Sequence, residues 1–148
     1  MREYKFRGKR VDEGEWLYGD ICHHDGRVSY IGQHPADGSM LLYDLLPETV
    51  GQYTGLKDKN GVEIYEGDIL KTPHYTFGRE DGFTTCTVYS KDGSFGVTVN
   101  DDGNRELVHL SELRVPTRFE YVSNVGEVAR EWTHPFEIIG NIHEGVTE

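Results

Sequence analysis

Polar and apolar residues alternate along short stretches of the chain, and glycine-containing turns separate these stretches. A period of two is typical of half-buried β-strands, because successive side chains point to opposite faces of a sheet. This alternation, with many β-branched and aromatic residues, predicts strands over residues 3–8, 15–22, 27–31, 84–90, 94–99 and 136–142. Asp25-Gly26 between the second and third of these favours a tight hairpin turn.

Other segments have the composition of connections. Glycine, proline and aspartate predict loops over residues 32–40 and 72–83. The apolar run 40–46 is expected to end at Pro47, which cannot donate a ladder hydrogen bond. Residues 110–113 are predicted to form a single helical turn.

One segment has helical rather than strand-like spacing. Its apolar positions recur at i, i+3, i+4 and i+7, namely Val125, Val128, Ala129 and Trp132. Asn124 is suited to cap such a helix and Pro135 to stop it. We therefore predict a short helix within residues 122–134, centred on 125–133. It is interpreted as core packing, with a partner-facing element as the alternative.

The predicted fold is mainly β, with α+β at the margin. It has an antiparallel, barrel-like or sandwich-like core and one short helix in the C-terminal half. The 148 residues are expected to form one domain, 1–148, with residues 1–46 as a candidate N-terminal subregion and 47–144 as the core.

Charge limits the classes of partner. The net charge is −11 and the isoelectric point is near 5.0, which disfavours binding to phosphate backbones or anionic membranes. The one basic stretch contains Arg2, Lys5, Arg7, Lys9 and Arg10. On a strand, Lys5, Arg7 and Lys9 share one face, which we interpret as solvated, with a nucleic-acid contact as the alternative. Direct nucleic-acid binding is not expected.

The cysteine content and hydropathy indicate a soluble cytoplasmic protein. Cys22 and Cys86 are far apart and do not form a disulfide framework. No apolar run approaches the roughly 18 residues of a membrane span. The first ten residues lack the apolar region of a signal peptide.

No pattern in the chain argues for catalysis or for a bound cofactor. Cys22 and His24 would point to one side of a strand, but a zinc site needs about two more ligands. They are weak metal candidates only, so no metal is predicted. Cys86 lies mid-strand and is expected to be buried. We favour a non-enzymatic protein and leave catalysis open.

The stretch from Pro47 to Leu70 is the richest in residues that specify backbone conformation. Asn60 and Gly61 tolerate the positive φ of a hairpin turn, and Glu66-Gly67-Asp68 predicts a second turn. The Asp68 carboxylate can accept hydrogen bonds from backbone N–H groups just beyond it. These five residues are assigned a structural role.

The same stretch, PETVGQYTGLKDKNG followed by EIYEGDI, resembles the signature of the YopX family. The opening YKFRG and the closing FEIIGNIHE are similar to the family's terminal motifs, although His143 stands where a tyrosine is expected. Residues 72–83 and 114–134 depart from the family's pattern. The resemblance implies a small phage or prophage protein that is β-rich and self-associating. It supplies no catalytic or binding residues.

We therefore expect a phage accessory protein, cytoplasmic in its bacterial host, that forms homo-oligomers and binds a host or phage protein. Trp16, Tyr18 and Trp132 are candidate interface residues, because tyrosine and tryptophan anchor protein interfaces. The alternatives are a nucleic-acid-related role, such as an acidic mimic of DNA, and a small metal-dependent hydrolase that uses Cys22 and His24.

Overall fold

The computed structural model describes residues 3–33, 35–76, 79–91, 93–99, 107–109, 115–133 and 135–146. Within these ranges the regular structure is antiparallel β-strand, apart from one 3₁₀ turn, η1 (Pro47–Thr49). The strands are β1 (Phe6–Lys9), β2 (Trp16–His24), β3 (Arg27–Gln33), β4 (Leu41–Asp44), β5 (Gly51–Lys57), β6 (Glu63–Tyr65), β7 (Asp68–Thr76), β8 (Arg79–Lys91), β9 (Ser94–Val99), β10 (Leu107–His109), β11 (Val115–Val122), β12 (Gly126–Thr133), β13 (Glu137–Asn141) and β14 (Gly145–Val146). The predicted antiparallel, mainly β class is confirmed.

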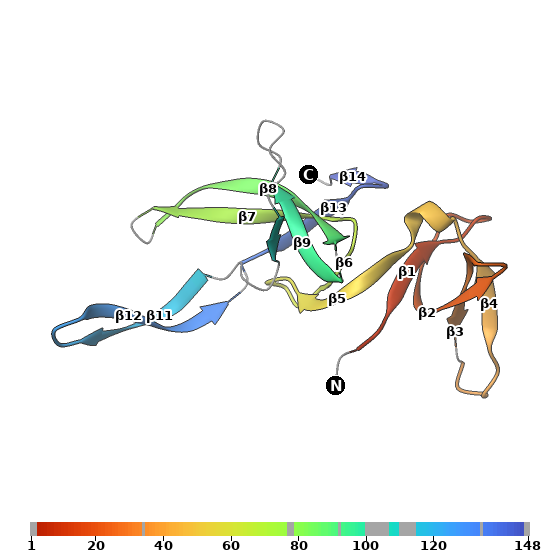
Figure 1. Cartoon of the computed structure of the whole chain (residues 1–148), viewed down its shortest axis with the longest axis horizontal. Helices are drawn as coiled ribbons and strands as arrows, with labels where there is room; N and C mark the ends of the chain where they lie inside the picture. Colours follow the sequence, from red (N-terminus) through yellow and green to blue (C-terminus); the bar gives the residue numbers. More distant parts are fainter. Residues whose placement is uncertain are drawn as a thin grey trace. The chain divides into compact units, whose positions relative to one another are not determined.

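The chain divides into two compact units (Figure 1). The first contains Met1–Leu56 and Glu63–Gly67, and the second contains Lys57–Val62 and Asp68–Glu148. Each unit has its own six-stranded sheet, and neither sheet closes into a barrel among the described strands. The predicted single domain, with a boundary near residue 46, stays a prediction.

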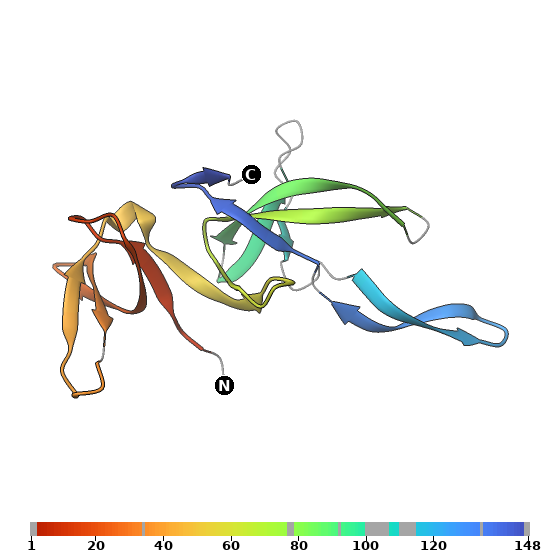
Figure 2. The same ribbon diagram turned by 180° about the vertical axis from the view of Figure 1, so that it is seen from behind.

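The sheet of the first unit has the strand order β4-β3-β2-β1-β5-β6. Its strands β1 to β4 curl, as both views show (Figures 1 and 2), and the end of β1 returns to the end of β4. There Arg10 and Leu45 form an isolated bridge, and the Leu46 N–H donates to the Lys9 carbonyl over 2.9 Å. This curl wraps one face of the sheet around an apolar cluster of Leu17, Ile31 and Leu45.

A glycine allows that cluster to close. A Cβ on Gly8 would lie 2.8 Å from Cδ1 of Leu45, so any larger residue would displace this buried leucine. The opposite side of β1 carries Lys5, Arg7 and Lys9, as the alternation predicts. The first sheet therefore has one apolar face and one face that is rich in cations.

The sheet of the second unit has the order β10-β9-β8-β7-β13-β14, and β7 lies between β8 and β13. The predicted loop over residues 72–83 is wrong, because β7 and β8 continue through it as one long hairpin. Thr72 pairs with Thr84, and Pro73 pairs with Phe83. The proline and glycines of this segment suggested a loop, whereas its β-branched and aromatic residues fit the pleated ladder.

The predicted helix within residues 122–134 is also wrong, because β11 and β12 form a hairpin there. Asn124 in the connecting turn has φ of 75°, and Gly126 at the start of β12 has φ of 94°. These left-handed conformations cannot continue a right-handed helix. Residues 115–122 then supply the pairing partner that makes 126–133 a strand. The predicted turn at 110–113 lies outside the described residues.

The central motif contributes a turn to the second unit, and Asp58 organises it. Oδ1 of this buried carboxylate accepts hydrogen bonds from the N–H groups of Asn60 (2.8 Å) and Val62 (2.9 Å). Oδ2 accepts from the N–H of Ile138 on β13 at 3.2 Å. Gly61 has φ of 81°, which the turn requires. Asp58 therefore joins the central motif to the closing motif.

The remaining motif residues lie in a second turn and the start of β7. Gly67 has φ of 90°, a conformation that favours glycine. Asp68 is 1% exposed and lies opposite Asn141 in the ladder between β7 and β13. Oδ1 of Asn141 accepts from the N–H groups of His143 and Glu144, which holds the closing turn.

Asp58→Ala removes three charge-assisted hydrogen bonds to backbone N–H groups. We expect it to lower the free energy of unfolding by about 3 kcal/mol, because three partly buried backbone N–H groups lose a charged acceptor. Asp58→Asn keeps an acceptor oxygen and should cost about 1 kcal/mol. Urea denaturation of both variants measures the difference. Equal, small losses would contradict the role of this carboxylate.

Candidate interaction surface

Arg7 lies at the centre of the cation-rich face of the first sheet. Its guanidinium carbon is 4.7 Å from the ring centroid of Trp16 and 5.1 Å from that of Tyr65. Nη2 donates a hydrogen bond to the Glu66 carbonyl at 3.3 Å. Arg7 is only 7% exposed, so the prediction that it belongs to a solvated face is wrong. Stacking on aromatic rings is the means by which a weakly hydrated guanidinium tolerates burial.

The sheet register explains why these groups meet. Arg7 is opposite Tyr18 on β2 and opposite Gly51 on β5, while Lys9 is opposite Trp16. A Cβ on Gly51 would lie 2.6 Å from the carbonyl oxygen of Glu66. The glycine therefore lets the backbone at Glu66 approach β5, where its carbonyl reaches Arg7.

Glu63 links the buried tyrosine to a lysine. Oε2 of Glu63 accepts a hydrogen bond from the Tyr65 hydroxyl at 2.9 Å, and Oε1 accepts one from Nζ of Lys5 at 2.7 Å. Nζ also lies 3.1 Å from a carboxylate oxygen of Glu3. The hydrogen bond to Glu63 raises the pKa of Lys5. Burial raises the pKa of Tyr65, and the hydrogen bond to Glu63 and its charge add to that rise.

Further ring contacts extend the cluster on both sides of Arg7. The rings of Tyr18 and Tyr53 lie 5.4 Å and 5.5 Å from that of Tyr65, between centroids. Lys5 is 5.7 Å from the centroid of Tyr53, and Lys9 is 5.6 Å from that of Trp16. We call this set the cation–aromatic face; it comprises Lys5, Arg7, Lys9, Trp16, Tyr18, Tyr53 and Tyr65.

Some rings of the cation–aromatic face are buried, and others are accessible to solvent. Tyr53 and Tyr65 are buried, whereas Trp16 is partly exposed and Tyr18 is 48% exposed. An exposed aromatic ring that is fixed by a buried neighbour can contact a partner with little loss of side-chain freedom. The arrangement suits molecular recognition through rings and cations.

Two of the three predicted interface residues come together here. Trp16 and Tyr18 both belong to the cation–aromatic face. Trp132 lies on β12 opposite Pro116, and its side chain is outside what the structure describes. Tyr53, Tyr65 and Glu63 were missed by sequence reasoning. Their signal was the aromatic–acidic pattern within the central motif, which looked purely structural.

The weak metal candidates both lie on β2. Cys22 is half-buried and opposite Tyr30, and His24 ends the strand opposite Arg27. Among the residues that the structure describes, no three His, Cys, Asp or Glu side chains form a metal-binding group. Cys86 is buried beside Thr72, as predicted, and burial raises the pKa of its thiol. In the same described ranges, no helix has the length and apolar composition that crossing a membrane requires.

Comparison with known proteins gives a family and a fold. The model of the YopX protein family matches residues 5–146, as the motifs predicted. The crystal structure of protein EF1440 from Enterococcus faecalis is similar, with a TM-score of 0.51 and 23% sequence identity. That match covers 97% of this chain and 95% of the other. No curated protein sequence matches the chain.

Arg7→Lys tests whether the planar guanidinium is needed between the rings. A lysine keeps the charge but cannot stack on Trp16 and Tyr65, so we expect a loss of about 1–2 kcal/mol in the free energy of unfolding. Arg10→Lys is the matched control, because Arg10 contacts one ring, that of Tyr43, and pairs with exposed acids. Urea denaturation should give it less than half the loss of Arg7→Lys, and equal losses would contradict the special role of Arg7.

The raised pKa of Tyr65 makes stability depend on pH in the alkaline range. The folded state holds this proton more tightly than the unfolded chain, whose tyrosine pKa is about 10. The contribution is therefore complete below that pH and is lost as the pH rises above it. Thermal unfolding at increasing pH should show that the melting temperature falls less steeply in the alkaline range for Tyr65→Phe than for the original protein. Parallel declines would refute the assignment.

Proposed function

The chain belongs to the YopX family, and from that premise we propose that it is a non-enzymatic phage or prophage protein that self-associates and binds a host or phage protein. The cation–aromatic face of the first sheet is the proposed docking surface. Its accessible part carries the residue types, tryptophan and tyrosine, that contribute most to binding energy at protein interfaces.

The single observation that carries this proposal is the placement of Arg7 between two rings. Because the guanidinium fixes Trp16 from below, the exposed part of that ring is already held in place before a partner arrives. Tyr18 is similarly placed against the buried ring of Tyr65. Pre-organised aromatic groups lose little conformational entropy on binding, which favours affinity.

The ion pairs favour a protein partner over a nucleic acid. Lys5 pairs with Glu3 and Glu63, and Arg10 pairs with Asp12 and Glu13. Binding to a phosphate backbone draws on cations that can replace counterions. Lys5 and Arg10, which flank β1, instead neutralise carboxylates of the same chain, whose net charge is −11.

An open sheet edge supports self-association. Strand β4 ends the first sheet, and Met40, Leu41 and Leu42 are 54%, 44% and 48% exposed. Leu41 and Leu42 are successive residues and point to opposite sides of the strand. An edge strand with apolar residues on both sides is a template for pairing with another strand. A second copy of the chain offers the same edge.

Tyr18→Ala, compared with Phe83→Ala, tests the proposed surface. Both rings are well exposed, at 48% and 58%, but Phe83 lies on β8 in the second unit. We expect affinity capture from host lysate to recover a protein whose binding weakens by about tenfold or more in Tyr18→Ala only. Sedimentation of the purified protein should show oligomers.

Two outcomes would contradict the proposal. One is a strict monomer that captures nothing above background. The other is a partner that binds both variants equally. Urea denaturation of Tyr18→Ala serves as the folding control, because Tyr18 also contacts Tyr65.

A further inference from the structure

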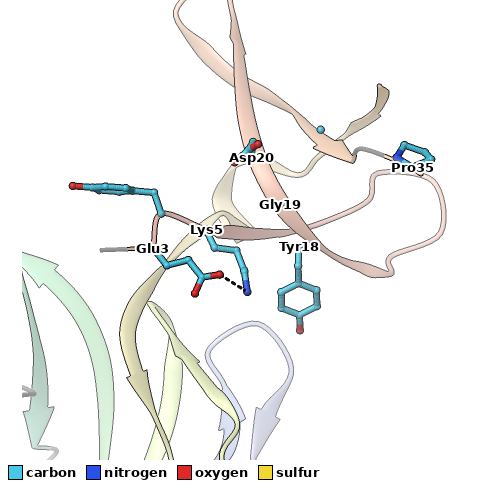
Figure 3. Close-up of a pocket in the computed structure, with 8 residues that line it drawn as sticks. Glu3, Lys5, Tyr18, Gly19, Asp20 and Pro35 are labelled. Carbon is cyan, nitrogen blue, oxygen red and sulfur yellow. Dashed lines mark ion pairs between the residues drawn. The ribbon is translucent and has the colours of Figure 1, made fainter. Parts of the chain in front are cut away.

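An open hollow of about 650 Å³ lies beside the cation–aromatic face, entirely within the first unit (Figure 3). This volume lies within the range of ligand-binding clefts, about 300–1,000 Å³. The lining comes from the segment before β1, from β2 and from β3 and the turn after it; it comprises Glu3, Tyr4, Lys5, Tyr18, Gly19, Asp20, Gly32 and Pro35. In the view of Figure 3, Glu3, Lys5 and Tyr18 lie on one side of Gly19 and Asp20 lies on the other.

Two glycines on neighbouring strands shape the hollow for different reasons. A Cβ on Gly19 would lie 2.5 Å from the carbonyl oxygen of Gly32, so the backbone requires glycine there. A Cβ on Gly32 would meet its nearest atoms, on Asp20, Leu42 and Met40, at 3.8–3.9 Å, which is ordinary contact. Gly32 is also not among the residues with positive φ.

The backbone therefore does not require glycine at position 32. A glycine inside a strand lowers stability and often marks a place where a ligand or another chain approaches closely. Ile31, its neighbour, points into the apolar cluster, so a side chain at position 32 would point to the other side. Gly32 is itself buried, and at this point the wall of the hollow carries no side chain.

Acidic groups dominate the charge around the hollow. Lys5 is shared between Glu3, at 3.1 Å, and Glu63, at 2.7 Å, so two carboxylates already surround one cation. Asp20 is exposed and is the second carboxylate of the lining, after Glu3. The net charge of −11 produces a field that attracts cations over longer distances.

Exposed rings complete the lining. Tyr4 is 64% exposed and Tyr18 is 48% exposed. The face of a tyrosine ring attracts ammonium and guanidinium groups, and its edge packs against the aliphatic stem of lysine or arginine. The adjacent cation–aromatic face holds Arg7 by the same combination of rings and an oxygen acceptor.

We propose that this hollow binds a lysine or arginine side chain from a basic segment of a partner protein. The inference rests on the proposed protein-binding function and adds the chemistry of the partner to it. Tyr4 and Tyr18 contact the side chain, Asp20 pairs with its charge, and the absence of a side chain at Gly32 leaves room for it.

The test uses the full-length ¹⁵N-labelled protein and two pentapeptides with blocked ends, Gly-Arg-Arg-Arg-Gly and Gly-Glu-Glu-Glu-Gly. We expect the arginine peptide to shift the amide signals of Lys5, Gly19 and Gly32 in a saturable manner, and the glutamate peptide to leave them unchanged. Asp20→Asn should weaken binding by about fivefold, the upper range for a partly exposed ion pair.

Two further variants separate a specific site from general attraction to an acidic protein. Glu80→Gln removes one exposed carboxylate from the second unit, and binding should stay within about twofold, since screened distant charges contribute little. Gly32→Val narrows the hollow without backbone clash and should abolish the shifts at Lys5 and Gly19. Its urea midpoint and amide spectrum confirm that the sheet is intact.

Three results would overturn the inference. They are unchanged binding in folded Gly32→Val, equal weakening in Asp20→Asn and Glu80→Gln, and shifts of the same amides on raising the protein concentration alone, which would assign the hollow to a second copy. The proposed function fails separately. A partner lost in Tyr18→Ala but retained in Gly32→Val refutes only this inference, whereas equal capture by Tyr18→Ala and Phe83→Ala refutes the function.

Discussion

The first sheet surrounds the buried guanidinium of Arg7 with two aromatic rings and a backbone carbonyl. Trp16 and Tyr65 cover its faces, and the Glu66 carbonyl accepts one of its N–H groups. These partners come from β2, β6 and the turn after β6, so the charge can be buried only when several strands are in place. The burial of this one cation thus depends on the strand order, the register and the glycine at position 51 together.

The central motif contains two kinds of constraint that look alike in a sequence. Asp58 and Gly61 shape a turn through hydrogen bonds and a left-handed conformation, and they tie it to β13 in the second unit. Tyr65 and Glu66 instead complete the surroundings of Arg7 in the first unit. The central motif is therefore rich in residues that specify conformation because it contributes contacts to both units. Its residues hold the fold, while the accessible rings of Trp16 and Tyr18 lie outside it.

Local patterns predicted those parts of the fold that depend on local physics. The hairpin of β2 and β3 followed from alternation and Asp25-Gly26, whose φ values of 51° and 74° are those of a tight turn. The helix at 122–134 failed because four apolar residues matched a helical period by coincidence. What decides that segment is its pairing with residues 115–122, and a single window of sequence does not contain the partner strand.

For the candidate site too, local patterns predicted some residues, and contacts between distant segments decided the others. Alternation placed Lys5, Arg7 and Lys9 on one face, and aromatic content marked Trp16 and Tyr18. The burial of Arg7 could not be predicted, because Tyr65 is 58 positions away along the printed sequence and reaches Arg7 only through the order β1-β5-β6. Likewise, the freedom of Gly32 to accept a side chain is a property of its surroundings.

The path of the chain between its two units constrains how the protein can be assembled. The backbone leaves the first unit after Leu56, returns at Glu63 and leaves again after Gly67. No single cut releases both units whole. On a ribosome, the surroundings of Arg7 stay incomplete until Glu66 has emerged, and the Asp58 carboxylate gains the Ile138 N–H only after the 80 residues that separate the two have been synthesised. The interleaved path therefore lets the surroundings of Arg7 in the first unit be completed earlier in translation than the Asp58 turn of the second unit.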